Sequence, residues 1–456
     1  MRVPQLSTHS ARAFDLHAVR FLALRCAVLA SVLLIGLYLP EHPFATGETL
    51  LAILFGLLTL LGAATLALML YAWRDAESLA ETEFAAGSLG PTLSFSLIVP
   101  ARHEERVLGA TIEQLARQDH PFFEVLVVVG HDDPGTLRVA AEAVGDDPRF
   151  RIIVDRNVEK NKPKALNVAL RECRGEIVGV FDAEDVVASG LLRTVDQTFQ
   201  TTGSQVVQGA TQLMNYRSSW FSARNVLEYF FWFRSRLHYQ ARIGFIPLGG
   251  NTVFVRRSWL DEAGGWDESC LAEDCDLGAR LSARGARAVV GYTSALVTQE
   301  ETPETIAALL KQRTRWNQGF LQVLRKGDWR ALPLRPRVLA AYTLAFPFLQ
   351  AGSLLLFPIT VALMIALGFP IELAVLSFAP LVPLFVILAV ELAGLQTLAG
   401  ELGFEVRVRD YARLVIGLVP YQLVLCLAAV RAVWRESRGI RNWEKTVHVG
   451  AHLSEP

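Results

Sequence analysis

The sequence predicts an α/β domain with a mainly parallel, Rossmann-like sheet, inserted between α-helical transmembrane segments. Apolar runs long enough to cross a bilayer lie towards both ends of the chain. Between them, from residue 74 to about residue 335, short strand-like runs alternate with helical ones and charges are frequent. Such alternation is typical of parallel, doubly wound sheets. Hydrophobic residues make up 52% of the 456 residues and charged residues 20%, which is too apolar for an ordinary soluble enzyme.

Residues 1–75 are expected to form a pair of transmembrane helices. The apolar runs 19–39 and 48–72 are each long enough to span. Arginines precede or open the first run, whereas the loop between the runs, PEHPFATGE, contains no Lys or Arg. The positive-inside rule therefore places the domain that follows in the cytoplasm, in a multi-pass protein of the inner (plasma) membrane.

A second pair of spans is expected at 338–398. The final apolar run, 414–434, is bracketed by basic residues, and a fifth crossing would put the basic tail outside the cell. Two alternatives resolve this conflict. Either residues 399–456 hold an interfacial or re-entrant hairpin broken at Pro420 and a basic loop, which is preferred, or the run 338–368 crosses in an unexpected way.

Acidic residues follow the strand-like runs of the central domain, 90–300. In doubly wound sheets, ligands bind beyond the carboxyl ends of the strands. The chain has no GxGxxG and no GxxxxGK[ST], so neither common nucleotide fingerprint applies. The net charge of −1 gives no argument for nucleic-acid binding, and none is expected. The acids at these strand ends are Glu104, Asp132, Asp133, Asp182, Glu184 and Asp185.

The segment VFDAEDV places three carboxylates directly after an apolar strand. Strand alternation puts Asp182 and Glu184 on one side and Asp185 on the other. Two carboxylates at a nucleotide crevice suit Mg²⁺ or Mn²⁺, which also binds phosphate oxygens. The alternative is that Asp185 or Ser189 caps the helix expected near Leu191. Capping explains one acid but not three, and the choice between Glu184 and Asp185 as second ligand stays open.

Two later segments carry further candidate groups. In LAEDCDLG, acids open a predicted helix, an arrangement that favours the helix dipole or provides a general base. Residues 301–330 have apolar residues at helical spacing and several cations, which predicts an interfacial amphipathic helix. An interfacial position does not by itself explain why Gln312, Arg315 and Trp316 occur together in this helix. An arginine can stabilise a departing diphosphate, and a tryptophan face suits a sugar ring.

In this order and spacing, the motifs resemble the membrane-embedded family 2 glycosyltransferases, the group of cellulose, chitin and hyaluronan synthases, and in particular bacterial exopolysaccharide synthases. The resemblance covers nearly the whole chain and implies a GT-A catalytic domain. It implies an inverting transfer from a nucleotide sugar, with a UDP-sugar favoured. The enzyme would elongate, and export, an extracellular polysaccharide at the lipid bilayer, with Mg²⁺ or Mn²⁺ as cofactor.

The resemblance also assigns residues. It makes Asp274, in AED, the general base, with Glu273 beside it. The metal position is FDAED, with Asp182, Glu184 and Asp185. Three departures stand out: the metal motif reads Asp-Ala-Glu-Asp, Ala272 replaces a threonine, and the FxVTxK gating sequence is absent. The implied donor-binding residues are Ala101, Glu104, Asp132, Asp133, Lys162, Lys164, Asp182, Gln312, Arg313 and Arg315; the acceptor-binding residues are Trp316, Gly250 and Asn251; and the gating-loop residues are Trp443, Lys445 and Thr446.

Other functions stay open at this point. A non-processive transferase would glycosylate a lipid acceptor, and a mannan synthase would use GDP-mannose. A transporter with a regulatory nucleotide-binding domain predicts charged or polar residues inside the spans, but these are scarce: the main ones are Glu391, Gln350 and Gln422. The sequence does not indicate the donor sugar, the linkage or the oligomeric state.

Overall fold

The computed structural model describes residues 43–74, 84, 89–368, 370–445 and 450. The first expected span, 19–39, lies outside these residues. The chain divides into two compact units, the first made of residues 1–62 and 360–383, and the second of residues 63–359 and 384–456.

The first unit contains helical segments only, among its described residues. They belong to α2 (Pro43–Met69), α14 (Leu334–Ala366), α15 (Ile371–Leu376) and α16 (Leu381–Leu402). Within this unit, a Cβ atom at Gly62 would lie 2.7 Å from Cγ of Pro383, so glycine permits the close approach of α2 and α16. In the described part of the chain, four helices are long and apolar enough to cross a membrane: Gly47–Met69, Leu334–Ala366, Ile371–Leu402 and Leu418–Ser437.

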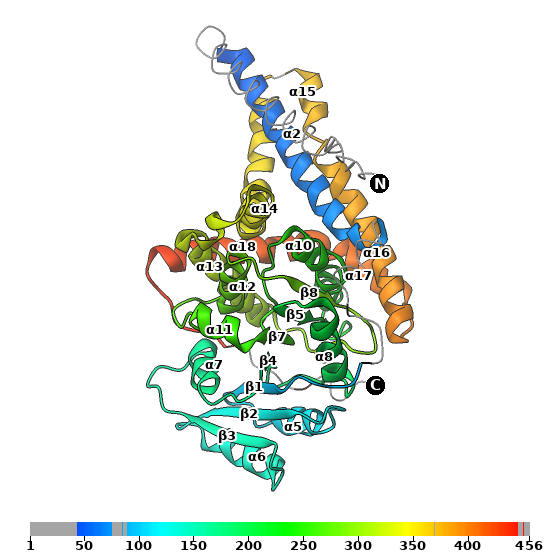
Figure 1. The fold of residues 1–456 in the computed structure, drawn as a ribbon. Helices are drawn as coiled ribbons and strands as arrows, with labels where there is room; N and C mark the ends of the chain where they lie inside the picture. The colour runs from blue at the N-terminus through cyan, green and yellow to red at the C-terminus, as the bar shows by residue number, and fades with distance from the viewer. Residues whose placement is uncertain (1–42, 75–83, 85–88, 369, 446–449, 451–456) are drawn as a thin grey trace, which may run out of the picture. The chain divides into compact units, whose positions relative to one another are not determined.

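The second unit is built on a seven-stranded sheet of order β3-β2-β1-β4-β7-β5-β8 (Figure 1). Neighbouring strands pair in parallel except at β7, which is antiparallel to both β4 and β5. The expected mainly parallel α/β fold is confirmed. The strands are β1 (Phe95–Ala101), β2 (Phe123–Gly130), β3 (Phe150–Asp155), β4 (Ile177–Val180), β5 (Val206–Gly209), β7 (Val253–Arg256) and β8 (Ala288–Gly291), and a separate pair is formed by β6 (Thr211–Leu213) and β9 (Thr298–Glu300).

Side chains of the central strands alternate between two hydrophobic cores, as period-2 geometry requires. Leu97 and Val99 of β1 belong to one core, and Ile98 belongs to the other. Because both faces are covered, the sheet is doubly wound. The first core includes residues of α5 (Leu108–Ala116), α6 (Pro134–Val144) and α8 (Leu191–Thr202). The second includes residues of α7 (Lys162–Leu170), α9 (Ser222–Phe231), α10 (Leu237–Ile243) and α12 (Glu273–Ala283).

Helix α13 (Ile306–Lys326) packs along α18 (Leu418–Ser437). Leu309 of α13 shares a buried cluster with Tyr421 of α18. The break in the last apolar run is at Gly417, between α17 (Val408–Ile416) and α18, and the prediction that placed it at Pro420 is wrong. Pro420 lies in the first turn of α18, where the backbone N–H has no intrahelical partner and proline is tolerated. The remaining elements are α3 (Tyr71–Arg74), η1 (Trp232–Arg236), α11 (Arg257–Ala263) and η2 (Asp328–Ala331).

Candidate active site

Three acids lie in a tight turn after β4. The strand ends at Val180, so the alternation expected for residues 182–185 does not apply there. Asp182 and Glu184 nevertheless converge, and they do so with Glu300 from the end of β9. One carboxylate oxygen from each of these three residues lies within 4.8 Å of the other two. Hard oxygen ligands of this kind fit Mg²⁺ or Mn²⁺.

Asp185 is fully buried and is engaged in the turn itself. Its carboxylate accepts hydrogen bonds from the Asp182 backbone N–H (2.8 Å) and from Nδ2 of Asn251 (3.0 and 3.2 Å). The same Asn251 nitrogen donates to Glu300. Burial and the nearby charge of Glu300 raise the pKa of Asp185. Helix α8 begins after Gly190 without a side-chain cap, so Asp185 does not cap it.

Lys162 opens α7 and faces the acidic turn. Its Nζ donates to the carboxylate of Asp182 and to the carbonyl oxygen of Gly250 (3.0 Å). Burial opposes its charge, but the carboxylates of Asp182, Glu273 and Asp274 outweigh burial and raise the pKa of Lys162. The ammonium group therefore stays charged beside the acidic turn.

The two acids that open α12 form a second buried carboxylate pair. Asp274 accepts a hydrogen bond from the Cys275 N–H (2.7 Å). A Cβ atom at Gly250, where φ is +83°, would lie 2.8 Å from Oδ2 of Asp274, so the Gly-Gly-Asn segment approaches this carboxylate closely. Burial raises the pKa of both carboxyls, that of Glu273 to about 7 with a further contribution from the Asp274 charge. Such a carboxylate can take a proton from a sugar or lipid hydroxyl.

Helix α13 brings the Gln-Arg-Trp group beside this pair. A Cβ atom at Gly319 would collide with Ala272, so α13 packs with almost no gap on the residue before α12. Nη1 of Arg315 lies 3.5 Å from the Leu271 carbonyl oxygen. Arg315 also lowers the pKa values of Glu273 and Asp274, against the larger effect of burial.

Aromatic rings flank the cations of this helix. The ring centroid of Trp316 lies 6.4 Å from that of Tyr229 of α9. The Arg315 guanidinium lies 4.5 Å from the ring centroid of Trp443, which belongs to the loop after α18. Oε1 of Gln312, one turn earlier, is buried without a protein partner, so a ligand hydroxyl is a suitable donor for it.

The C-terminal loop joins α13 to the first loop of the catalytic domain. Nζ of Lys445 lies 2.8 Å from Oε1 of Glu104 and donates to the His103 carbonyl oxygen (3.1 Å). Between Trp443 and Lys445, the Glu444 carboxylate forms two 2.7 Å hydrogen bonds to Arg431 of α18. Three consecutive side chains thus bind three different elements. Thr446 lies outside the described residues.

The acids of the first two loops have local partners. Asp132 pairs with both Nη atoms of Arg102 (3.2 and 3.1 Å), and these hydrogen bonds keep the pKa of Asp132 below its usual value. Asp133 caps α6 and accepts from the His103 N–H (2.6 Å), which stabilises the positive φ of 53° at His103. Ala101 ends β1 and is buried.

Two of the expected donor-binding cations point to other partners. Lys164 donates to Glu159 (3.1 Å). Arg313 binds Glu228 and the hydroxyl of Tyr421 (3.3 Å), and its guanidinium lies 4.7 Å from the Trp316 ring centroid. These contacts leave Arg313 beside the site as a link between α9, α13 and α18.

Glu300 is the site residue that the sequence did not reveal. It ends β9, a three-residue strand that pairs with β6 outside the main sheet. Alternating strands and helices give no signal for such a pair. The available signal was the acidic run QEETPE ahead of the α13 helix.

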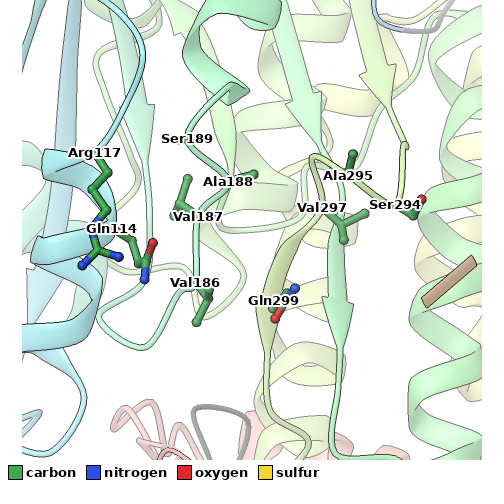
Figure 2. A pocket seen from close by; sticks show the side chains of 10 residues that line it. All are labelled: Gln114, Arg117, Val186, Val187, Ala188, Ser189, Ser294, Ala295, Val297 and Gln299. Carbon is green, nitrogen blue, oxygen red and sulfur yellow. The ribbon is translucent and has the colours of Figure 1, made fainter. Parts of the chain in front are cut away.

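A separate pocket of about 340 Å³ is lined in part by the residues that follow the acidic turn (Figure 2). Gln114 of α5 and Arg117, which follows this helix, form one wall, and residues 186–189 form another. Gln299, the neighbour of Glu300, also lines it. None of the three clustered carboxylates lines this pocket, so it is distinct from the candidate active site.

Fold and site together define a nucleotide-sugar-dependent glycosyltransferase with a GT-A domain. The family model described as "Glycosyltransferase like family 2" matches residues 91–319, about half of the chain. The chain belongs to this family.

Relatives of the chain include enzymes that make glycolipids and polysaccharides. It is 28% identical over 373 residues to the beta-monoglucosyldiacylglycerol synthase of Nostoc sp., covering 78% of this chain and 76% of that one. It is 24% identical over 254 residues to the poly-beta-1,6-N-acetyl-D-glucosamine synthase of Staphylococcus epidermidis, covering 55% and 60%. The mannosyltransferase PcManGT from Pyrobaculum calidifontis, solved with GDP-Man and Mn²⁺, shares the fold with a TM-score of 0.54, 21% identity and coverage of 83% of this chain and 99% of that one.

Proposed function

We propose that the protein transfers a hexose from a nucleotide sugar to a hydroxyl group of a membrane lipid. The observation that carries this proposal is the similarity to beta-monoglucosyldiacylglycerol synthase over 78% of the chain, well beyond the matched domain at 91–319. The named product of that relative is a glucosylated diacylglycerol. This similarity moves the lipid acceptor ahead of the polysaccharide expected from the sequence motifs, and a UDP-sugar remains the preferred donor.

The buried acids at the start of α12 support an inverting mechanism. Asp274 takes the proton from the acceptor hydroxyl, whose oxygen attacks the anomeric carbon while the bond to the nucleoside diphosphate breaks. Lys162 and Arg315 stabilise the negative charge that develops on the leaving diphosphate. Asp182 and Glu184 would hold Mg²⁺ or Mn²⁺, which when bound supplies further positive charge to the diphosphate oxygens.

Polymer elongation is the second candidate. It is favoured by the Gln312, Arg315 and Trp316 group, which the sequence shares with polysaccharide synthases. The similarity to poly-beta-1,6-N-acetyl-D-glucosamine synthase, over 55% of this chain, agrees with it.

Product size separates the two candidates. We would supply the purified full-length protein in lipid nanodiscs with a panel of UDP- and GDP-sugars, Mg²⁺ or Mn²⁺, and diacylglycerol, and analyse products by mass spectrometry. A lipid that carries one hexose is the expected product. Polymer without glycolipid, from any donor, would reject the lipid-acceptor proposal. Asp274→Asn should abolish transfer while nucleotide binding persists, and normal turnover would remove the base assignment.

We also propose that α18 lies in the bilayer interface, with the catalytic domain on the cytoplasmic side of the plasma membrane. Both ends of α18 contact the domain: Tyr421 donates to Glu228 (3.0 Å), and Glu436 accepts from Gln318 (3.0 Å). A tag after residue 456 should be digested by protease in inside-out vesicles only, and digestion in right-side-out cells would contradict this placement. The opposite face of α18 exposes an apolar stripe of Val419, Leu423, Leu427, Val430 and Trp434.

A further inference from the structure

We infer that Glu300 is a third carboxylate ligand of the divalent metal, in addition to the two residues of the acidic motif. The inference rests on the metal-dependent transfer proposed above, but it concerns how the ion is held and does not depend on the acceptor. The oxygens of Asp182, Glu184 and Glu300 lie within 4.8 Å of one another. Because Mg²⁺ binds oxygen at about 2.1 Å, small rotations of these side chains bring all three onto one ion.

Backbone pairing fixes Glu300 next to the acidic turn. Val186 and Gln299 form an antiparallel bridge, with N–H to O distances of 3.1 and 3.0 Å. In this register, residue 300 lies opposite residue 185. Parallel pairing of β9 with β6 holds the strand from its other side. Strand hydrogen bonds therefore position Glu300, which makes it a better-ordered ligand than a residue on a free loop.

Hydrogen bonds assign different roles to Asp185 and Glu300. Both oxygens of Asp185 accept from Asn251, and one also accepts from the Asp182 N–H. Asn251 is held in turn by the Thr211 hydroxyl, 2.7 Å from its Oδ1. Asp185 is therefore a positioning residue that shapes the turn. Glu300 is only partly buried and is one of the three clustered carboxylates. Asp185 is not part of this cluster.

A third carboxylate also changes the order in which the ligands bind. The Lys162 ammonium offsets only one of the three negative charges, so these carboxylates still repel one another and a divalent cation relieves that repulsion. They would fill three of the six positions around Mg²⁺ or Mn²⁺ and leave three for diphosphate oxygens and water. We therefore expect the metal to bind before the donor, at a site where the protein supplies three of the six ligands.

Mn²⁺ binding to the donor-free protein tests the inference. Electron paramagnetic resonance of the full-length protein in detergent counts free Mn²⁺ during a titration. Glu300→Gln should weaken Mn²⁺ binding at least about 10-fold, because even the loss of a partner that only supports a ligand costs about 10- to 100-fold in metal affinity. Glu300→Asp, which keeps the charge on a shorter side chain, should weaken it less. The glutamine oxygen can still accept from Asn251 and one repelling charge is removed, so the metal-free melting temperature should not fall.

Glu304→Gln is the matched control, because it removes an exposed carboxylate from the same segment. It should leave Mn²⁺ binding unchanged. Equal affinity of Glu300→Gln and the unmodified protein would overturn the inference. So would a larger loss in Asp185→Asn than in Glu300→Gln. Neither measurement uses a sugar or an acceptor, so these outcomes are independent of whether the product is a glycolipid.

Discussion

At the scale of single residues, the buried pair Glu273 and Asp274 should set the pH dependence of the proposed transfer. Burial raises the pKa of both carboxyls, that of Glu273 to about 7. Glu273 beside the proposed base Asp274 takes up a proton as the pH drops through about 7, so the rate should fall over that range and level off above it. Initial rates of nucleoside diphosphate release, measured between about pH 5 and pH 9, show this acidic limb of the pH–rate profile.

Glu273→Gln tells which acid controls that limb. Without the neighbouring carboxylate, the proton-binding group near pH 7 is gone, and the limb should move to lower pH while turnover above it continues. A limb that stays near pH 7 would assign it to a group other than Glu273, with Asp274 among the candidates. Apparent values would belong to the pair as a whole, since two carboxyls this close titrate together.

At the scale of elements, the C-terminal loop depends on α18 for its position. Glu444 binds Arg431 through both oxygens and lies 3.3 Å from Nη1 of Arg435. Its neighbours Trp443 and Lys445 reach Arg315 and Glu104. Glu444→Gln should therefore loosen the loop and raise the KM for the donor by roughly fivefold, the effect of about 1 kcal/mol for a partly exposed ion pair.

Limited proteolysis shows whether Glu444→Gln makes the C-terminal loop more mobile. Cleavage after residue 438 should speed up in Glu444→Gln. Glu142→Gln, which breaks the exposed Arg138–Glu142 pair of α6 (2.9 Å), should change neither the cleavage nor the KM. A faster cleavage with an unchanged KM would show that the loop does not hold the donor.

At the scale of the whole molecule, the sequence predicted those parts of the fold that depend on neighbouring residues. The alternation of strands β1 to β3 with helices follows from local sequence pattern, and this alternation was predicted. The antiparallel direction of β7 was not predicted, because β7 pairs with β4 and β5, which are distant from it along the chain. The Glu300 contact was missed for the same reason, since β9 meets the acidic turn through a single bridge.

The polar residues of the later apolar helices have partners that are visible only in the folded molecule. Gln350 of α14 donates to Gln422 of α18 (2.6 Å), and Glu391 of α16 pairs with Arg224 of α9 (2.6 Å). The transporter alternative predicted polar residues that line a path. These groups instead bind one another or the catalytic domain, which agrees with the glycosyltransferase family.

The Arg224–Glu391 pair should contribute strongly to the attachment of α16 to the catalytic domain. Arg224 is 3% exposed, and it also donates to the Leu414 carbonyl of α17. Removal of one partner leaves a buried charge without its counter-ion, so Glu391→Gln should lower the free energy of unfolding by about 3 to 5 kcal/mol. Thermal unfolding in detergent would measure the loss.

The second ion pair between α16 and the domain supplies the control. Arg234 and Glu401 are 3.2 Å apart and more exposed, at 29% and 21%. Glu401→Gln should therefore cost only about 1 kcal/mol or less. The double variant Arg224→Met, Glu391→Leu should recover most of the loss, because no unpaired charge remains. Equal losses in Glu391→Gln and Glu401→Gln would contradict the argument, since burial would then not distinguish the two pairs.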